Sequence, residues 1–410
     1  MNMTKSLPEL PVPQRRAIEI VREVAIEKGV HPYLVGGPVR DMLLDRGAFD
    51  IDLTLEQDSS TLARALAKRL GGRVKSFPQF LTYKVSADDL PEIDIATARK
   101  ERYRKPGALP TVSEGKLRDD LLRRDFTVNA IAFDLIDARL VDPAGGERDV
   151  RERVIRILHD ASFVDDPTRI FRALRLAARL GFTIERDTAQ QMRDAIESGA
   201  LGTVARERIW RELFLAMDEA IAPKVLNELM CSGALRILFG HRKADLESLD
   251  RVQKQATVNP ELDKYVLYTS ALLRGDASPV DLEGSGFSQK RARNVVQIAN
   301  ELPRFSDALT EAKSERQRLR LLRHASPELL SAIAAMQPDR RNEVARFQEF
   351  QTFKLPLRGN DLEVPGGPHV ARALERTREA VFTGEIGAGD AQTYARELAK
   401  KYLAELKIDS

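Results

Sequence analysis

The feature that most constrains this chain is a pair of glycines, Gly36-Gly37, which directly follows the apolar segment Tyr33–Val35. Glycine carries no Cβ, so a Gly-Gly turn lets the backbone come close to a bound phosphate group. Residues 39–44 are expected to open a helix, whose first N–H groups would point at the same anion. The sequence therefore predicts a strand, a tight turn and a helix arranged around a phosphate.

A pair of aspartates, Asp50 and Asp52, stands in an alternating run shortly after this unit. On a strand, residues i and i+2 face the same side, so the two carboxylates would converge and their repulsion would need relief by cations. A phosphate-binding turn beside such a pair is the layout of a metal-dependent phosphoryl or nucleotidyl transferase. Taken separately, the two features are more often a simple turn and a solvated strand edge. Their occurrence in one unit favours the functional interpretation.

Three further motifs follow along the chain. They are Arg-Arg-Asp-Phe-Thr-Val-Asn-Ala at residues 123–130, Asp-Asp-Pro-Thr-Arg at residues 165–169 and Glu-Arg-Ile-Trp-Arg-Glu at residues 207–212. With these motifs in this order, the chain resembles the class II tRNA nucleotidyltransferases (CCA-adding enzymes) and the bacterial poly(A) polymerases. Both groups belong to the polymerase-β-like nucleotidyltransferase superfamily. The resemblance extends over about residues 30–215.

The resemblance implies an α+β fold. A polymerase-β-like nucleotidyltransferase head, with a small mixed sheet and helices, would be followed by an all-helical neck, body and tail. We expect the catalytic head at residues 1–157, the base-selecting neck at 158–220, the RNA-binding body at 221–325 and the tRNA-binding tail at 326–410.

The hydrophobic pattern agrees with this division. Short β-like runs alternate with helical ones up to about residue 156, which predicts a small mixed sheet with helices on one side. From Asp166 onward, apolar residues recur at helical spacing. Strands are expected at residues 33–35, 50–55, 82–85, 92–96 and 130–135, a helix at 12–29, and linkers at 143–146, 258–260 and 365–368.

The resemblance assigns catalysis to acidic residues of the head. Asp50 and Asp52 would bind two Mg²⁺ ions, of which one activates the attacking 3′-hydroxyl and the other neutralises charge on the triphosphate and the leaving pyrophosphate. A third carboxylate is often needed in this superfamily, and Asp94, in a strand-like run, is the natural candidate. An ordinary strand-edge aspartate is the alternative for Asp94.

The same resemblance assigns the nucleotide site. Gly37 and Arg40 match the turn that contacts the triphosphate, although an ion pair with a neighbouring aspartate would also explain Arg40. Arg124 matches a nucleotide-contacting arginine of the family. Asp125 and Asn129 are expected to hold that helix and the ribose side of the pocket, with a helix cap as the alternative for Asn129.

Asp166, Arg169, Arg172 and Arg175 recur at every third position, which places them along one slowly drifting helix face. A solvent-exposed stripe of salt bridges would explain this spacing. The resemblance favours instead that Asp166 and Arg169 read the Watson–Crick edge of C or A, because Asp accepts from their amino groups and Arg donates to the ring nitrogen and carbonyl. The substrates would then be CTP and ATP. Asp165 stands where the family most often has Glu, and we expect little effect because the charge is retained.

Two further segments are expected to shape the pocket. Glu207, Arg208 and Glu212 recur at helical spacing and are interpreted as a salt-bridge cluster that braces it. The segment between Arg99 and Arg123 has few bulky apolar residues and enough charge to stay mobile, which predicts a flexible loop. In the family, a loop at this position acts as a lever that reshapes the pocket when specificity switches from C to A. Its full length here predicts that terminal A can be added.

The partners implied are tRNA and nucleoside triphosphates. Arg316, Arg318 and Arg320 form a local basic segment that would contact RNA phosphates, with a solvated helix face as the alternative. No apolar run approaches the roughly 18 residues that span a bilayer. Residues 1–13 lack the apolar core of a signal peptide, and the single cysteine fits a reducing cytoplasm. We therefore expect a cytoplasmic protein with no membrane association and no evident obligate protein partner.

The leading functional prediction is template-independent addition of CCA to the 3′ end of tRNA from CTP and ATP, with release of pyrophosphate. An enzyme that adds only A stays open, because residues 163–169 look like both A-adding and CCA-adding relatives, whereas the full-length loop disfavours a CC-adding enzyme. A poly(A) polymerase is a further alternative, but residues 72–77 match its basic-aromatic signature poorly. A non-catalytic RNA-binding protein is not expected to keep both catalytic aspartates, Arg124 and Arg169.

Overall fold

The computed structural model describes residues 11–46, 50–241, 244 and 246–408. The chain forms two compact units, with the boundary after Gly240. The predicted head and neck both belong to the first unit, together with the first residues of the predicted body, and the four-part division stays a prediction. The expected absence of a signal peptide concerns residues 1–13, of which residues 1–10 lie outside the described part of the chain.

A mixed sheet organises the described part of the first unit. Its strands are β1 (Tyr33–Val35), β2 (Ile51–Leu55), β3 (Arg73–Phe77), β4 (Thr82–Ser86), β5 (Ile93–Thr97), β8 (Ala132–Asp134) and β9 (Arg139–Val141). They are arranged in the order β3-β4-β5-β2-β1-β8-β9. Strands β2 and β5 pair in parallel, and the other neighbours are antiparallel. The predicted small mixed sheet is confirmed.

The two parallel strands alternate between a buried and a polar face. Leu53 of β2 lies opposite Ile95 of β5, and both side chains are at most 1% exposed. Because successive residues of a strand point to opposite faces, the preceding residues Asp52 and Asp94 lie on the other face. Those two aspartates are also partners in the register. The apolar packing of this layer therefore places two carboxylates side by side.

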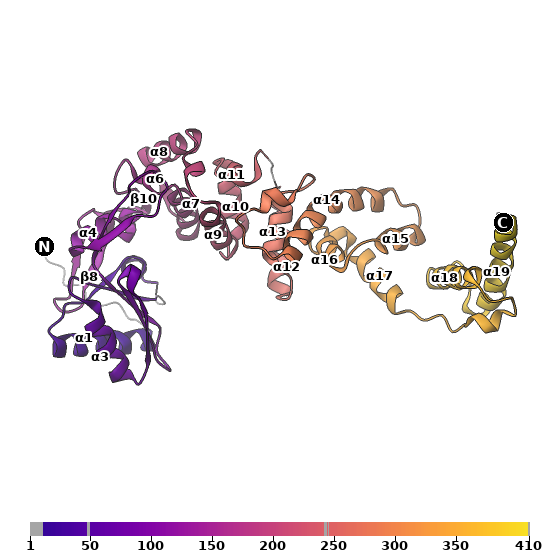
Figure 1. Cartoon of the computed structure of the whole chain (residues 1–410), viewed down its shortest axis with the longest axis horizontal. Coiled ribbons are helices and arrows are strands. Elements are labelled where there is room, and N and C mark those ends of the chain that lie inside the picture. Colours follow the sequence, from indigo (N-terminus) through magenta and orange to yellow (C-terminus); the bar gives the residue numbers. More distant parts are fainter. Residues whose placement is uncertain (1–10, 47–49, 242–243, 245, 409–410) are drawn as a thin grey trace. The chain divides into compact units, whose positions relative to one another are not determined.

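Two long helices cover the sheet beside β4 and β5. Helix α3 (Ser59–Leu70) contacts both strands, and α1 (Val12–Lys28) lies against α3 (Figure 1). Helix α1 ends at Gly29 in the left-handed conformation, and the carboxylate of Asp58 caps α3 by accepting from Ser60 N at 3.0 Å. The shorter helices of the predicted head are α2 (Gly37–Leu43), η1 (Pro78–Phe80), α4 (Leu117–Leu122), η2 (Thr127–Asn129) and α5 (Gly146–Glu152).

The segment between Arg99 and Arg123, predicted as a flexible loop, holds regular secondary structure. Strands β6 (Arg99–Arg102) and β7 (Thr111–Glu114) form an antiparallel hairpin, and α4 follows it. The hairpin is held by polar contacts, since Arg123 Nη1 donates to Glu101 Oε1 at 2.9 Å. Because ion pairs rather than apolar residues hold it, hydrophobic periodicity gives little signal here. The segment is therefore a hairpin and a short helix rather than an irregular loop, and its role in nucleotide choice stays a prediction.

Amphipathic helices build the rest of the first unit. Trp210 is 1% exposed, and its ring lies against those of Phe214 and Phe239. Strands β10 (Val154–Ile155) and β11 (Thr183–Ile184) form a short parallel pair that joins the predicted head to the predicted neck. The helices are α6 (Ser162–Asp165), α7 (Arg169–Leu180), α8 (Arg186–Glu197), η3 (Ala200–Thr203), α9 (Arg206–Met217), α10 (Ala222–Cys231) and α11 (Arg236–Phe239).

The second unit contains helices and no strand in its described residues. Serine residues at positions 288, 314 and 326 cap the helices α14, α15 and α16 by accepting a backbone hydrogen bond. The elements are α12 (Leu246–Val258), α13 (Lys264–Leu272), η4 (Pro279–Leu282), α14 (Gln289–Glu311), α15 (Glu315–Leu322), α16 (Pro327–Met336), η5 (Pro338–Arg340), α17 (Arg341–Thr352), η6 (Gly359–Leu362), α18 (Pro368–Phe382), η7 (Ala388–Asp390) and α19 (Ala391–Ile408).

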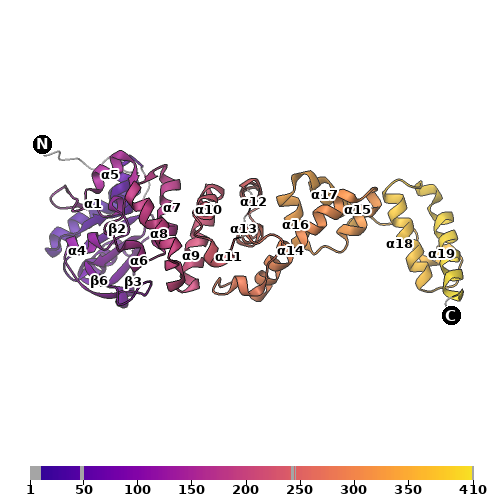
Figure 2. The same cartoon turned by 90° about the horizontal axis from the view of Figure 1, so that it is seen from above.

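The last two helices, α18 and α19, lie side by side (Figure 2). Leu362, Ala373, Ala395 and Ala399 form a buried apolar cluster where they meet. Small alanine side chains let the two helices approach closely. The expected linkers at 258–260 and 365–368 fall at the end of α12 and immediately before α18. Within the described ranges, no helix is long and apolar enough to cross a membrane.

Candidate active site

The Gly-Gly turn connects β1 to α2, and Gly36 is the residue that the turn requires. Its φ is 74°, a left-handed conformation that favours glycine. A Cβ on Gly36 would lie 2.4 Å from Nη1 of Arg124, whereas a Cβ on Gly37 would make an ordinary contact, 3.5 Å from Nη2 of Arg40. The sequence predicted a phosphate-binding turn at Gly36-Gly37 and assigned the triphosphate contact to Gly37, and the structure shows that Gly36 is the one whose conformation favours glycine. The place of Gly36 directly after a strand is the signal that identifies it.

Arg40 is buried, and hydrogen bonds fix its guanidinium. Its Nε and Nη2 donate to Asp41 at 2.9 Å each, and its Nη1 donates to Asn129 Oδ1 at 2.5 Å. Asn129 in turn donates to Asp125 Oδ1 at 2.9 Å. The ion pair considered as the alternative for Arg40 is therefore present, and contact with the triphosphate stays a prediction.

Three acidic residues concentrate negative charge at the N-terminal ends of the neighbouring strands β2 and β5. Asp52 and Asp94 are partners across β2 and β5, and Asp50 immediately precedes β2. Burial, followed by the negative charge of Asp94, raises the pKa of Asp52 to about 6, against the opposing effect of Arg124. Burial also raises the pKa of Asp94, although Lys84 Nζ lies 3.3 Å from its Oδ1 and acts in the opposite direction.

This acidic group offers the ligand type that a divalent cation takes, although the ligand atoms of Asp50, Asp52 and Asp94 do not all lie within 4.8 Å of one another among the described residues. Carboxylate oxygens are ligands that Mg²⁺ prefers. Oδ1 of Asp94 is buried, and its charged partner among the described residues is Lys84 Nζ. Burial and the neighbouring charge of Asp94 disfavour the ionised form of Asp52 and raise its pKa, and a bound cation would favour the ionised form. The predicted metal ligands Asp50 and Asp52 thus have the donor atoms and the charge that a metal site needs.

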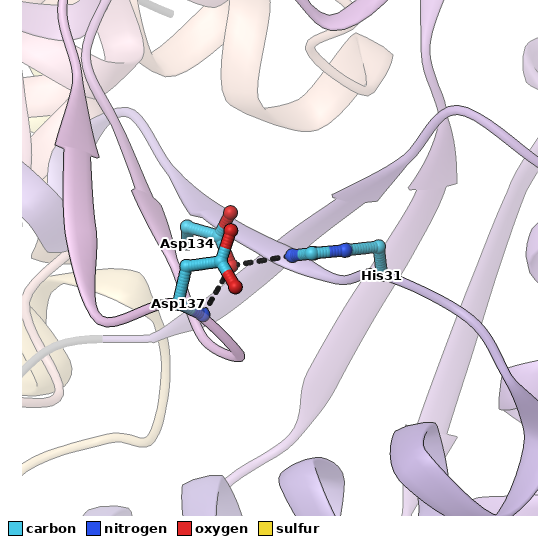
Figure 3. Close-up of side chains that lie close together, drawn as sticks. All are labelled: His31, Asp134 and Asp137. Carbon is cyan, nitrogen blue, oxygen red and sulfur yellow. Dashed lines mark hydrogen bonds and ion pairs between the residues drawn. The ribbon is translucent and has the colours of Figure 1, made fainter.

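A second group with metal-ligand atoms lies at the opposite end of the sheet. His31, Asp134 and Asp137 bring one ligand atom each within 4.8 Å of one another (Figure 3). Asp134 pairs with Tyr33 at the start of β1, whereas the Gly-Gly turn follows the end of that strand. Oδ1 of Asp134 accepts from His31 Nε2 at 2.6 Å and from two backbone N–H groups of the β8–β9 turn at 2.9 Å. These hydrogen bonds hold the β8–β9 turn in place, and this structural role accounts for the group.

The carboxylate of Asp166 is held through one of its oxygens. Oδ1 accepts from Thr168 N at 3.1 Å, from Thr168 Oγ1 at 2.6 Å and from Arg208 Nη2 at 2.9 Å. Among the described residues none donates a hydrogen bond to Oδ2, which leaves that oxygen able to accept from an amino group. Asp166 therefore has the acceptor that recognition of C or A requires.

Arg169 is 4% exposed and is held from two directions. Its Nη1 donates to Ser162 Oγ at 2.6 Å, and its Nη2 donates to the carbonyl oxygen of Arg123 at 3.0 Å. A guanidinium has five N–H donors, so these bonds leave further donors. Arg169 lines the same pocket as Asp166. The base-reading role of Arg169 stays a prediction.

Arg172 and Arg175 form ion pairs inside the first unit. Arg172 donates to Asp125 Oδ2 through Nε at 2.9 Å and Nη2 at 2.5 Å, and Arg175 lies 3.3 Å from Glu212 and 3.4 Å from Glu219. Burial alone would raise the pKa of Asp125, but Arg172, Asn129 and Arg169 together outweigh burial and lower it to about 2. The predicted helix face holds Arg169, Arg172 and Arg175 but not Asp166, which is extended and lies before α7. Nucleotide contact by Arg172 and Arg175 stays a prediction.

A pocket of about 820 Å³ brings most predicted residues together. Asp94 is not among its lining residues but neighbours Asp52. Glu101, Tyr103 and Arg179 also line the pocket and were missed. The first two were missed because their hairpin has little apolar pattern, whereas the position of Arg179, one helical turn after Arg175, is a signal that sequence reasoning could have used. The predicted residues in the lining are Gly37, Arg40, Asp50, Asp52, Arg124, Asp166, Arg169, Arg172 and Arg175.

The basic segment of the second unit is engaged in contacts within that unit. Arg316 on α15 lies 3.0 Å from Glu385, and Arg320 lies 2.9 Å from Glu379, a side chain that is 3% exposed. Arg318 donates to a backbone carbonyl at 3.0 Å. The contacts of Arg316 and Arg320 fix α15 against α18 and the segment that follows it. Contact of Arg316, Arg318 and Arg320 with RNA stays a prediction.

Known proteins are similar to this chain in sequence and in fold. A family model, the poly A polymerase head domain, matches residues 32–156. The A-adding tRNA nucleotidyltransferase of Halalkalibacterium halodurans is 35% identical over 300 residues, which cover 70% of each chain. That of Geobacter sulfurreducens is 32% identical over 416 residues, covering 93% of this chain and 46% of the relative. The multifunctional CCA protein of Xanthomonas campestris is 39% identical over 241 residues, covering 56% of this chain and 55% of the relative.

A solved structure is similar along most of the chain. It is a tRNA nucleotidyltransferase complexed with a primer tRNA and an incoming ATP analogue, 30% identical, with a TM-score of 0.65, covering 80% of this chain and 97% of that one. This chain belongs to the class II tRNA nucleotidyltransferase family. It spans about half the length of the Geobacter and Xanthomonas relatives. The predicted polymerase-β-like head with a mostly helical remainder is the fold of this family.

Proposed function

We propose that this chain adds adenosine from ATP to the 3′ end of tRNA, without a nucleic-acid template and with release of pyrophosphate. The observation that carries the proposal is one pocket that joins the Gly-Gly turn, the acidic residues Asp50 and Asp52, and the Asp166 carboxylate. A phosphate-binding turn, a metal site and a base acceptor are the parts that nucleotidyl transfer needs. The relatives from Geobacter and Halalkalibacterium are named A-adding enzymes, which supports adenosine as the nucleotide.

The head is proposed to work by positioning and by electrostatic stabilisation. Asp50 and Asp52, with Asp94 beside them, would hold Mg²⁺, two ions by the family resemblance. Bound Mg²⁺ would lower the pKa of the attacking hydroxyl and neutralise charge on the triphosphate. Arg40 and Arg124 place positive charge beside the Gly-Gly turn, where the missing Cβ of Gly36 lets Arg124 approach, and this charge would hold the triphosphate.

The neck is proposed to choose the base. Oδ2 of Asp166 would accept from the amino group of adenine, and Arg169 would donate to the neighbouring ring nitrogen. Guanine and uracil present a carbonyl where adenine and cytosine carry the amino group, so a carboxylate would repel them. The base would therefore be selected by these two protein side chains, without a nucleic-acid template.

The second candidate function is addition of the complete CCA sequence. It is favoured by the Xanthomonas relative, named a multifunctional CCA protein and 39% identical over 241 residues. The Asp166 acceptor also suits cytosine, whose amino group occupies the same position on the Watson–Crick edge. CTP and ATP would then both be substrates.

Two tRNA substrates separate the candidates. One ends at the residue before CCA, and the other already ends in CC; each is offered ATP and CTP separately and together. Extension of only the CC-ended tRNA, by one adenosine, is the expected result. Extension of the shorter tRNA by three nucleotides would establish the second candidate. Equal extension of an unstructured RNA by many adenosines would replace both with poly(A) polymerase activity, and an inert protein would overturn the proposal.

A further inference from the structure

The tip of the β6–β7 hairpin is docked against the neck helices. Gly107 N donates to the carbonyl oxygen of Asp165 at 3.2 Å, and Gly107 O accepts from Arg208 Nη1 on α9 at 2.9 Å. Gly107 has φ of 69°, and a Cβ there would lie 2.3 Å from Thr203 Oγ1 and 2.7 Å from Thr203 O. The tip therefore approaches η3 so closely that a side chain does not fit.

Arg208 reaches two functional elements with one guanidinium. Its Nη1 binds the hairpin tip, and its Nη2 donates to Oδ1 of Asp166 at 2.9 Å. The guanidinium is planar and rigid, so its two arms keep a fixed geometry. A shift of the hairpin tip would therefore turn the Asp166 carboxylate or break one of the two bonds.

The same hairpin also supplies the wall of the pocket near Asp166. Glu101 of β6 and Tyr103 just beyond it both line the pocket. Burial is the first cause that raises the pKa of Tyr103 to about 12, so its hydroxyl stays protonated over the ordinary pH range. Hairpin position and carboxylate orientation thus act on the same end of the pocket.

We propose that Arg208 is a positioning residue for base selection, which latches the β6–β7 hairpin to Asp166 and so presents Oδ2 to the incoming base. The inference rests on the proposed function and deepens it. Arg208 is placed to act through Asp166. With the latch closed, Oδ1 is occupied by Arg208 and Thr168, and Oδ2 is the remaining acceptor. With the latch open, the carboxylate can rotate, and its preference for an amino group weakens.

The variants open the latch from both of its sides. Arg208→Gln removes the guanidinium, and Arg208→Lys keeps the positive charge but not the two N–H groups that bind Gly107 and Asp166. Gly107→Ala pushes the hairpin tip away from η3 without changing Asp166 or Arg208. The matched control is Arg156→Gln. Arg156 also bridges two elements, lying 3.0 Å from Asp149 and 3.3 Å from Glu185, but does not line the pocket.

The measurement is kcat/KM for ATP, CTP, GTP and UTP on CC-ended tRNA, at saturating Mg²⁺. A charge-assisted hydrogen bond lost from the latch should reduce discrimination between ATP and GTP by about tenfold or more. We expect this loss in Arg208→Gln, Arg208→Lys and Gly107→Ala. The Arg208→Gln, Gly107→Ala double variant should discriminate between ATP and GTP as well as either single variant, because both changes disrupt the same contact between the hairpin tip and Arg208. The control should keep wild-type discrimination.

Hydrogen exchange of backbone amides in residues 103–110 gives a second readout that needs no activity. Opening the latch should accelerate exchange there in Arg208→Gln and leave it unchanged in the control. Unchanged discrimination in an active Arg208→Gln variant, with or without faster exchange, would overturn the inference and leave the proposed function standing. A wild-type protein that extends no tRNA would overturn the proposed function, and the inference with it.

Discussion

Replacing Arg172 by methionine should destabilise the first unit strongly. Asp125 is 8% exposed, and its Oδ2 receives both Nε and Nη2 of Arg172. Methionine keeps the apolar stem of the side chain and removes the charge. The Asp125 carboxylate would remain buried, with Asn129 and a backbone N–H as its partners. Breaking a buried ion pair by removing one partner costs about 3–5 kcal/mol.

We expect the lower end of this range, about 3 kcal/mol, because the Arg172 side chain is 39% exposed and water will reach part of the vacated space. Trp210 is the single tryptophan and is buried in the first unit. Its fluorescence during urea unfolding therefore reports this unit without contribution from the second. A loss below about 1 kcal/mol, the range of exposed salt bridges, would refute the reasoning.

The pH dependence provides an internal control. The pKa of Asp125 is lowered from 3.8 to about 2 in the folded protein, so its contribution to the free energy of unfolding is complete above pH 3.8 and is lost as the pH falls towards 2. The difference between wild type and Arg172→Met should therefore be largest near neutral pH and shrink as the pH falls towards 2. The double variant Asp125→Asn, Arg172→Met should recover much of the lost stability, because no buried charge is left unpaired.

Three further changes test separate parts of the account. Gly36→Ala forces a side chain into a left-handed conformation and towards Arg124, and should cost roughly 1–2 kcal/mol in the Trp210 unfolding assay together with a lower apparent affinity for ATP. Asp166→Ala should keep nucleotide addition and admit GTP or UTP; unchanged selectivity would leave the salt-bridge interpretation. Arg320→Gln leaves Glu379 buried without its main partner, and should lower the melting temperature of the second unit. A lower salt dependence of tRNA affinity in the same variant would indicate phosphate contact.

The head could be predicted from sequence where apolar alternation is strong. Strand β1 was expected at its observed bounds, and β2, β4 and β5 within one or two residues at each end. Their register then brings Asp52 beside Asp94, which the sequence suggested through the two strand-like runs. Strands β3 and β9 were missed because they are short or largely exposed. The five exposed or half-exposed residues of β3 give no buried face to detect.

The long-range polar contacts of the site could not be predicted, because they depend on residues far apart in the chain. Arg172 was placed on the correct helix face, but its partner Asp125 lies 47 residues earlier. The spacing of Arg208 suggested a brace, yet neither Gly107 nor Asp166 follows from helical periodicity as its partner. Arginine stripes therefore identify a functional face, while tertiary packing decides which arginine meets an acid and which is left for the ligand.

The measurement that tests the central claim most directly is addition of labelled AMP to CC-ended tRNA by Asp52→Asn. Asparagine keeps the shape of the side chain and removes the charge that the metal site requires. The account predicts one added adenosine with the wild-type protein, addition reduced by at least about a thousandfold with Asp52→Asn, and tRNA affinity changed less than about threefold. Addition by Asp52→Asn at the wild-type rate would contradict the assignment of this site as the catalytic centre.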